Sequence, residues 1–139
     1  MYPAYEILEH PADVGFLAYG ATLEILFANA ALAMLSLACD PALIAEREQR
    51  EIRATGAYTE LLLYAWLAEI LGIADAEGLF FRRVEVRELS GTHARGVAYG
   101  EPFDRSRHRP GTYIKAVTLH QFRVEETDDG WRARVYLDV

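Results

Sequence analysis

Two stretches of the chain carry apolar residues at helical spacing, which predicts helices with one buried face. The first covers residues 22–38, and its apolar positions are Leu23, Leu26, Phe27, Ala30, Met34 and Leu35. Thr22 is a suitable N-cap, and Asp40-Pro41 is expected to stop this helix. The second covers residues 59–71, with Gly72 as its predicted end and an apolar stripe of Leu62, Trp66 and Ile70.

Most of the remaining chain alternates between apolar and polar residues, which is typical of strands. The alternating segments are 50–55, 79–89, 92–101, 112–127 and 131–139. Ser90-Gly91 and Asp129-Gly130 are expected to turn two hairpins. This order of elements predicts an α+β fold, in which two α-helices pack on an antiparallel-rich, mixed β-sheet within a single domain over residues 1–139.

The long segment 112–127 changes its apolar face part-way along. Val117 and Leu119 share one parity, whereas Phe122 and Val124 share the other. The change falls across His120-Gln121. A β-bulge there would restore the core face and redirect His120, so the pattern predicts a bulge.

Composition narrows the class of protein. The chain has 139 residues, of which 52% are hydrophobic and 25% charged, an ordinary globular balance. Its apolar runs are too short to span a bilayer, and its N-terminus lacks the pattern of a secretory signal. Cys39 is the only cysteine, which excludes an internal disulfide and fits a cytoplasmic protein. We expect a buried, structural thiol.

Charge and motifs exclude several functions. The net charge of −7 argues against broad neutralisation of nucleic-acid phosphates, so no strong nucleic-acid binding is expected. No phosphate-binding loop, CxxC pair or HExxH motif occurs, which disfavours nucleotide hydrolysis and a structural zinc site.

Asp13 is the first candidate site residue, within the stretch "EHPADVGF". One interpretation is that it caps a turn after Pro11, as aspartate often does. The other is that Pro11 and Gly15 bend the backbone so that the Asp13 carboxylate is held for a cation.

Asp138 is the second candidate. Alternation in "WRARVYLDV" places it on the polar face of the last segment, beside Val139. Its carboxylate and the adjacent carboxyl of Val139 would make an oxygen-rich donor suited to Ca²⁺ or Mg²⁺. The simpler interpretation is an exposed strand end.

Further polar residues have a structural and a functional interpretation each. Lys115 is either an edge lysine that discourages aggregation or a cation beside the carboxylates. His10 and His120 are more often packed histidines than ligands. The loop 101–111, which includes Arg107 and His108, is either solvated surface or a contact for phosphate or an acidic partner.

Four motifs follow one another over nearly the whole chain: "YEILEHPADVGFLAYGATLEILFANAALAML", "GEPFDRSRH", "IKAVTLHQFRVEE" and "GWRARVYLDV". Taken together, they resemble the archease family. Family members generally have His-Thr-Ala-Asp where this chain has His10-Pro11-Ala12-Asp13, so the aspartate is retained and only the local turn differs.

The resemblance implies an accessory protein rather than an enzyme. Its partner would be the GTP-dependent RNA ligase of tRNA splicing, whose guanylylation and multiple turnover it would promote. It also implies a divalent metal ion, Ca²⁺ or else Mg²⁺ or Mn²⁺, held by Asp13, Asp138 and Val139. The lysine of the family's Lys-Ala-Val motif falls on Lys115.

Two alternatives stay open. One is a small metal-dependent hydrolase that uses Asp13 and Asp138, with His120 as base. The other is a general chaperone-like module in which a metal only fastens the C-terminus to the first strands.

Overall fold

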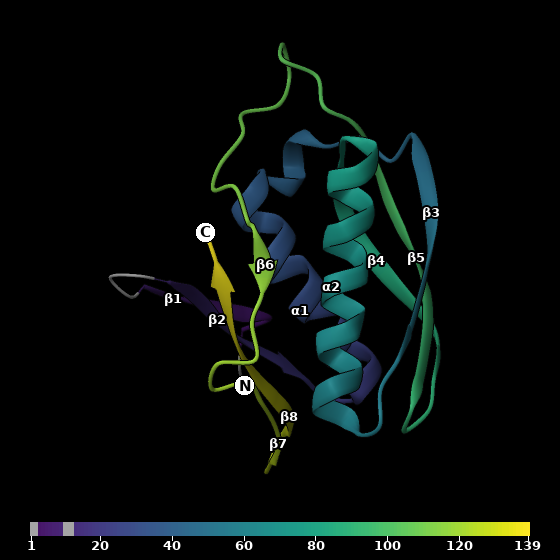
Figure 1. Cartoon of the computed structure of the whole chain (residues 1–139), viewed down its shortest axis with the longest axis vertical. Coiled ribbons are helices and arrows are strands. Elements are labelled where there is room, and N and C mark those ends of the chain that lie inside the picture. Colours follow the sequence, from purple (N-terminus) through teal and green to yellow (C-terminus); the bar gives the residue numbers. More distant parts are fainter. Residues whose placement is uncertain (1–2, 10–12) are drawn as a thin grey trace.

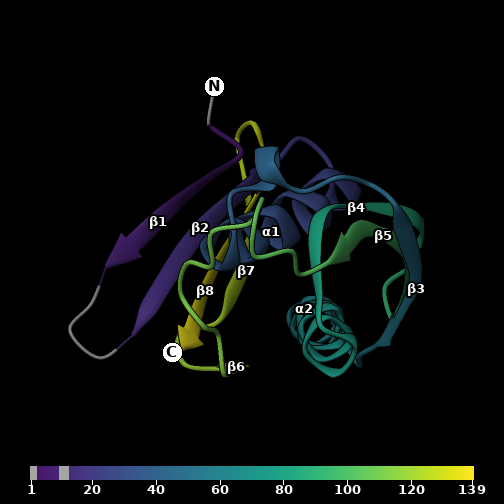
Figure 2. The same cartoon turned by 90° about the horizontal axis from the view of Figure 1, so that it is seen from above.

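The strands form two antiparallel sheets with two helices between them (Figures 1 and 2). The computed structural model describes residues 3–9 and 13–139. The larger sheet has the order β1-β2-β8-β6, with β7 also on β8; its strands are β1 (Tyr5–Glu9), β2 (Val14–Gly20), β6 (Ala116–Val117), β7 (Arg123–Thr127) and β8 (Gly130–Asp138). The smaller sheet has the order β3-β5-β4; its strands are β3 (Glu48–Thr55), β4 (Leu79–Leu89) and β5 (His93–Pro102).

This arrangement confirms the predicted α+β class, and it adds a division that the sequence pattern did not indicate. The strands separate into two sheets, and every pairing within the described residues is antiparallel. Each helix has neighbours in both sheets: α1 (Leu23–Ala38) packs chiefly on β2 and β4, and α2 (Thr59–Glu77) chiefly on β3.

The first helix begins and ends where the sequence predicts. The Thr22 hydroxyl accepts a hydrogen bond from the Ile25 amide at 3.2 Å, which satisfies one of the free donors of the first turn. After Cys39 the chain enters a short 3-10 turn, η1 (Pro41–Leu43), in which the Ala42 amide donates to the Asp40 carboxylate at 3.0 Å.

The second helix is longer than predicted. Gly72 lies inside it, and the helix ends at Gly78, which adopts the left-handed conformation with φ of 64°. A glycine there avoids the steric cost that a Cβ carries at positive φ. Gly72 was the wrong stop because the apolar contacts of α2 hold the helix through it.

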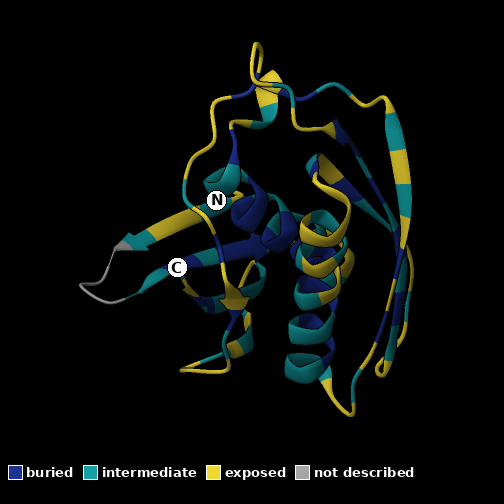
Figure 3. Ribbon diagram, turned by 45° about the horizontal axis from the view of Figure 1, so that its top comes forward, coloured by how far each residue is buried: buried dark blue, intermediate teal, exposed yellow. Residues whose placement is uncertain are grey.

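One apolar cluster joins both sheets and both helices, and its helical part is dark in Figure 3. The indole Nε1 of Trp66 on α2 donates to the carbonyl of Phe27 on α1 at 3.3 Å, so the only polar atom of this fully buried side chain is satisfied. No helix among the described residues is both long and apolar enough to cross a membrane.

The predicted strand 112–127 is broken. Residues 112–115 are not strand, and β6 and β7 lie in line along the same edge of β8. Val117 is opposite Leu137, and Arg123 is opposite Arg134. The chain therefore takes six residue steps from β6 to β7 to cover a length of β8 that spans three residue steps. The predicted single-residue bulge is therefore a larger turn. Because the number of extra residues is odd, the side chains after the turn switch faces of the sheet. This switch explains why the apolar residues change parity in the sequence.

Both predicted hairpins are present. The Ser90 amide bonds the His93 carbonyl at 2.8 Å in the first. In the second, Thr127 is opposite Gly130, so the turn residues are Asp128 and Asp129, one position before the predicted pair.

Replacing Gly72 in α2 and Gly96 on β5 by alanine should have opposite effects on stability. Gly72→Ala should stabilise the protein by about 0.5–1 kcal/mol, because a Cβ there has nothing within 4 Å and alanine favours helix. Gly96→Ala should destabilise it by about 2 kcal/mol, because its Cβ would lie 2.6 Å from the Trp66 ring and 2.1 Å from the Glu85 carbonyl oxygen. Urea unfolding of the two variants checks the signs, and a destabilising Gly72→Ala would contradict this account of α2.

Candidate functional site

The two candidate aspartates come from distant parts of the chain to neighbouring positions in the larger sheet. The pairing of β2 with β8 ends at Val14 opposite Leu137. Asp13 comes just before β2, and Asp138 is the last residue of β8, so each is one residue beyond this last pair. Leu137 is fully buried, so by alternation Asp138 lies on the outer face, away from the helices. Asp138 is exposed and Asp13 half-buried, which leaves both accessible to a ligand or a partner.

Gly15 has a different role from the predicted one. It is a strand residue opposite Tyr136, and it has no positive φ. A Cβ on Gly15 would lie 2.7 Å from the Tyr136 ring, so the glycine makes room for that ring rather than bending the chain. Pro11 lies outside the described residues.

Lys115 lies on the other side of β8. Its backbone amide donates to the Asp138 carbonyl at 2.8 Å, just before the pairing of Ala116 with Asp138. Lys115 is exposed and lines a groove of about 200 Å³ against α2. Val139, which follows Asp138 in the chain, packs in part against the core. The sheet therefore brings Asp13, Asp138, Val139 and Lys115 to one end.

The donor set fits a hard cation only in part. Carboxylate and main-chain oxygens are the ligands that Ca²⁺ and Mg²⁺ take, and two carboxylates leave further positions for water. Within residues 3–9 and 13–139, no three His, Cys, Asp or Glu side chains are grouped to hold a metal ion. Any ion here would need main-chain or terminal oxygens beside the two aspartates.

The histidine predictions have different outcomes. His10 lies outside the described residues. His120 is exposed on the turn between β6 and β7, so the prediction of a packed core histidine is wrong. Its ring lies 5.7 Å from the Tyr136 ring, centroid to centroid, because the inserted turn carries it over the outer face.

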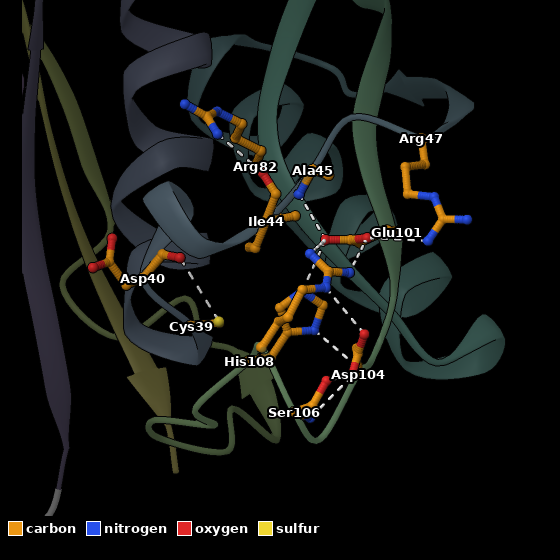
Figure 4. A network of polar contacts seen from close by, with 11 residues as sticks. Cys39, Asp40, Ile44, Ala45, Arg47, Arg82, Glu101, Asp104, Ser106 and His108 are labelled. Atoms are coloured by element: carbon orange, nitrogen blue, oxygen red, sulfur yellow. Dashed lines mark hydrogen bonds and ion pairs between the residues drawn. The ribbon is translucent and has the colours of Figure 1, made fainter.

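A buried carboxylate that the sequence analysis did not single out organises the loop after β5. Glu101 is fully buried and accepts hydrogen bonds from the Ala45 amide at 2.6 Å, from Arg107 at 2.5 and 3.0 Å, and from His108 at 2.9 Å (Figure 4). The Arg107 guanidinium is the largest influence that lowers the pKa of Glu101, to about 2, against the opposing effect of burial.

His108 is buried, and each nitrogen of its ring makes one hydrogen bond. The Asp104 amide donates to Nδ1 at 2.9 Å, so the proton lies on Nε2 and is donated to Glu101. Ser106 is the main cause of the lowered pKa of Asp104, about 2, and Arg107 adds to it. Arg107 and His108 thus bind the protein's own carboxylates. The interpretation of this loop as solvated surface is wrong for the buried His108, whereas Arg107 stays exposed while it pairs with Glu101 and Asp104. Glu101 was visible in the sequence only as part of the motif "GEPFDRSRH".

The same loop continues to the candidate site. The Gly111 and Thr112 amides donate to the carbonyls of Ala38 and Leu37 at 2.7 and 2.8 Å, which satisfies the last turn of α1. Cys39, beside them, is buried, and burial raises the pKa of its thiol, as expected of a structural cysteine. The loop therefore has attachments at Glu101, at the end of α1 and at Asp138.

Comparison with known proteins agrees with this arrangement. The family model of the Archease protein family (MTH1598/TM1083) matches residues 5–139. The chain belongs to the archease family. It is 42% identical to protein archease of Methanosarcina acetivorans over 139 residues, which cover 97% of this chain and 95% of that protein. The archease of Pyrococcus furiosus is 37% identical, with 97% and 98% of the two chains covered.

Solved structures show the archease fold directly. The solution structure of Methanobacterium thermoautotrophicum protein 1598 matches with a TM-score of 0.84 and 35% identity, over 98% of this chain and 99% of that one. A Thermotoga maritima protein described as an archease and possible chaperone matches with a TM-score of 0.65 and 22% identity, over 95% and 94%. This second match supports the fold alone.

The Glu101 network predicts an acid-sensitive contribution to archease stability. The Glu101 pKa falls from 4.5 to about 2 on folding, so its contribution is complete above pH 4.5 and is lost as the pH falls through about 2. Glu101→Gln should cost roughly 3 kcal/mol at pH 7, because it replaces the buried carboxylate that accepts hydrogen bonds from Ala45, Arg107 and His108 by an amide that cannot accept all of them.

Urea unfolding from pH 7 to pH 2 measures both effects. The matched control is Glu88→Gln, which removes a carboxylate from an exposed pair with Arg95 and should change the stability much less, because solvent screens that pair. Equal losses for the two variants would contradict the structural role given to Glu101.

Proposed function

We propose that this archease is a metal-binding accessory protein that activates the GTP-dependent RNA ligase of tRNA splicing. That ligase joins RNA ends bearing a 3′-phosphate or 2′,3′-cyclic phosphate to 5′-hydroxyl ends. The accessory protein promotes guanylylation of the ligase and its multiple turnover. Membership of the archease family supports this function. So does the position of Asp13 and Asp138, each one residue beyond the last pair of β2 with β8.

The neighbouring aspartates are the observation that carries the proposal. Asp138 lies on the outer face of the larger sheet, over which no described helix packs, and Asp13 lies at the same end of the sheet, half-buried. A partner protein can therefore reach both carboxylates. Asp13, Asp138 and a main-chain oxygen of Val139 would hold the ion. A divalent ion supplies positive charge that neutralises phosphate oxygens during nucleotidyl transfer.

Residues around the aspartates have supporting roles in the proposal. Lys115 is fixed beside Asp138 through its backbone amide, and its exposed ammonium makes no ion pair within the described residues. His120 lies over Tyr136, two residues before Asp138 on the same face. We assign these two side chains, together with His10, to contacts with the ligase. Arg107 and His108 instead position the loop that carries Lys115.

Metal binding by the isolated protein is the first test. Asp13→Asn and Asp138→Asn should each weaken Ca²⁺ and Mn²⁺ binding by about tenfold or more, because each removes a charged oxygen ligand. Isothermal titration calorimetry measures the change. Asp128→Asn removes the same charge from the exposed turn between β7 and β8 and should leave affinity unchanged. Binding that survives in both site variants would refute the metal site.

Ligase activation is the second test. The wild-type protein should increase guanylylation and multiple turnover of the RNA ligase at low GTP, and Asp13→Asn, Asp138→Asn and Lys115→Gln should each reduce that stimulation by about tenfold. The readout is joined RNA product per ligase molecule, with Asp128→Asn as the control of equal charge change.

Measurements without the ligase and with unrelated enzymes separate the two alternative functions from ligase activation. A hydrolase would act on RNA or nucleotide without ligase, and its activity would depend on His120. A general chaperone would protect unrelated enzymes from aggregation as well as the ligase, and the aspartate variants would retain that protection. Stimulation that survives in both aspartate variants would contradict the proposed mechanism.

A further inference from the structure

Three arginines from two strands meet on the outer face of the larger sheet, at the end opposite the aspartates. Arg123 comes from β7, and Arg132 and Arg134 come from β8. With Leu17 and Glu125 they line a depression of about 180 Å³. We name these five residues the arginine depression.

The pairing within this depression is electrostatically unfavourable. Arg123 lies directly opposite Arg134 in the pairing of β7 with β8. Like charges at directly opposed positions on one face destabilise an antiparallel pair. An anion bound between the two guanidinium groups would remove that repulsion.

One carboxylate holds two of the three arginines in place. Glu125 lies opposite Arg132, whose Nε donates to it at 3.0 Å, and Arg123 Nε lies 3.2 Å from its other oxygen. Arg132 is the main cause of the lowered pKa of the Glu125 carboxyl. The depression therefore keeps an excess of two positive charges.

Arg134 is the arginine without a carboxylate. Its Nε donates to the Gln121 carbonyl at 3.0 Å, which fixes the plane of the guanidinium, and its terminal nitrogens have no hydrogen bond or ion pair among the described residues. Glu6 lies on the far side of Leu17, on β1, and accepts from the Tyr19 hydroxyl at 3.2 Å. It is the other carboxylate facing this region from a neighbouring strand.

We propose that the arginine depression binds a phosphate monoester of a nucleotide or of an RNA end. Guanidinium groups present paired N–H donors that match two phosphate oxygens, and a fixed guanidinium loses little freedom on binding. The Tyr136 and His120 rings lie next along the same face: Tyr136 is two residues from Arg134, a spacing of about 7 Å in a strand. A base beside these rings leaves its phosphate over Arg134 and Arg123.

The net charge of −7 limits what this site can hold. The negative charge of the protein repels long polyanions. A single phosphate or a pair of phosphates can still bind, because its attraction to the arginines acts within a Debye length of about 8 Å at physiological salt. The site is therefore distinct from a general nucleic-acid surface, and binding to it does not require the ligase.

The test is an NMR titration of the isolated, ¹⁵N-labelled protein with inorganic phosphate, with GMP and with a short RNA bearing a 3′-phosphate. We expect shifts at the Nε–H groups of Arg123 and Arg134. The double variant Arg123→Gln/Arg134→Gln should raise the Kd at least about tenfold for all three probes. Arg95→Gln, which changes an arginine on β5, the central strand of the smaller sheet, should alter the Kd less than about twofold.

The three probes distinguish the source of the phosphate. Tighter binding of GMP than of inorganic phosphate, with shifts at Tyr136, supports a nucleotide; tightest binding of the RNA with its 3′-phosphate, and loss on removing that phosphate, supports an RNA end. Shifts confined to other strands, an unchanged Kd in the double variant, or equal displacement by an acidic peptide would overturn the proposal. Because no ligase is present, failure here leaves the ligase assay unaffected.

Discussion

The pairing of β8 with β2 is the interaction on which both the fold and the candidate site depend. It joins the last strand to one of the first, from Gly20 opposite Trp131 to Val14 opposite Leu137. The inner side of this pairing supplies fully buried side chains to the core, such as Phe16 and Val135. The same alternation sends the next polar residues outward. Removing the pairing would therefore remove the core contact and also the placement of Asp13 and Asp138 at the same end of the sheet.

A second constraint fixes the loop between β5 and β6. This segment has no strand partner for most of its length, so its polar groups need other contacts. The buried Glu101 carboxylate supplies one anchor through Arg107 and His108, and the open carbonyls at the end of α1 supply another. Burial of the Glu101 charge is costly, and four hydrogen bonds from three residues offset that cost. Together these two anchors hold the loop that leads to β6, and they thereby fix the position of Lys115.

The outer face of the larger sheet then has an ordered distribution of charge. Alternate residues of β8 present Arg132, Arg134, Tyr136 and Asp138 along one side of the strand. Basic groups therefore lie at one end and acidic groups at the other, with the Tyr136 and His120 rings between them. The metal ion and the phosphate that we propose would therefore bind at separate positions of this face, although the protein as a whole is acidic.

Local patterns in the sequence determined most elements of this protein. Helical spacing and the Thr22 cap located α1, and period-two alternation located β4 and β5 to within a residue, because these signals act between near neighbours in the chain. The tertiary structure alone decided the extension of α2 through Gly72, the division into two sheets, the length of the turn at His120 and the burial of Glu101. Each depends on contacts that no local pattern shows. For α2 and the sheets these contacts join segments far apart in sequence, and for Glu101 they combine the distant Ala45 amide with Arg107 and His108 of its own loop. Their energy exceeds the local preference of a glycine or a charged residue.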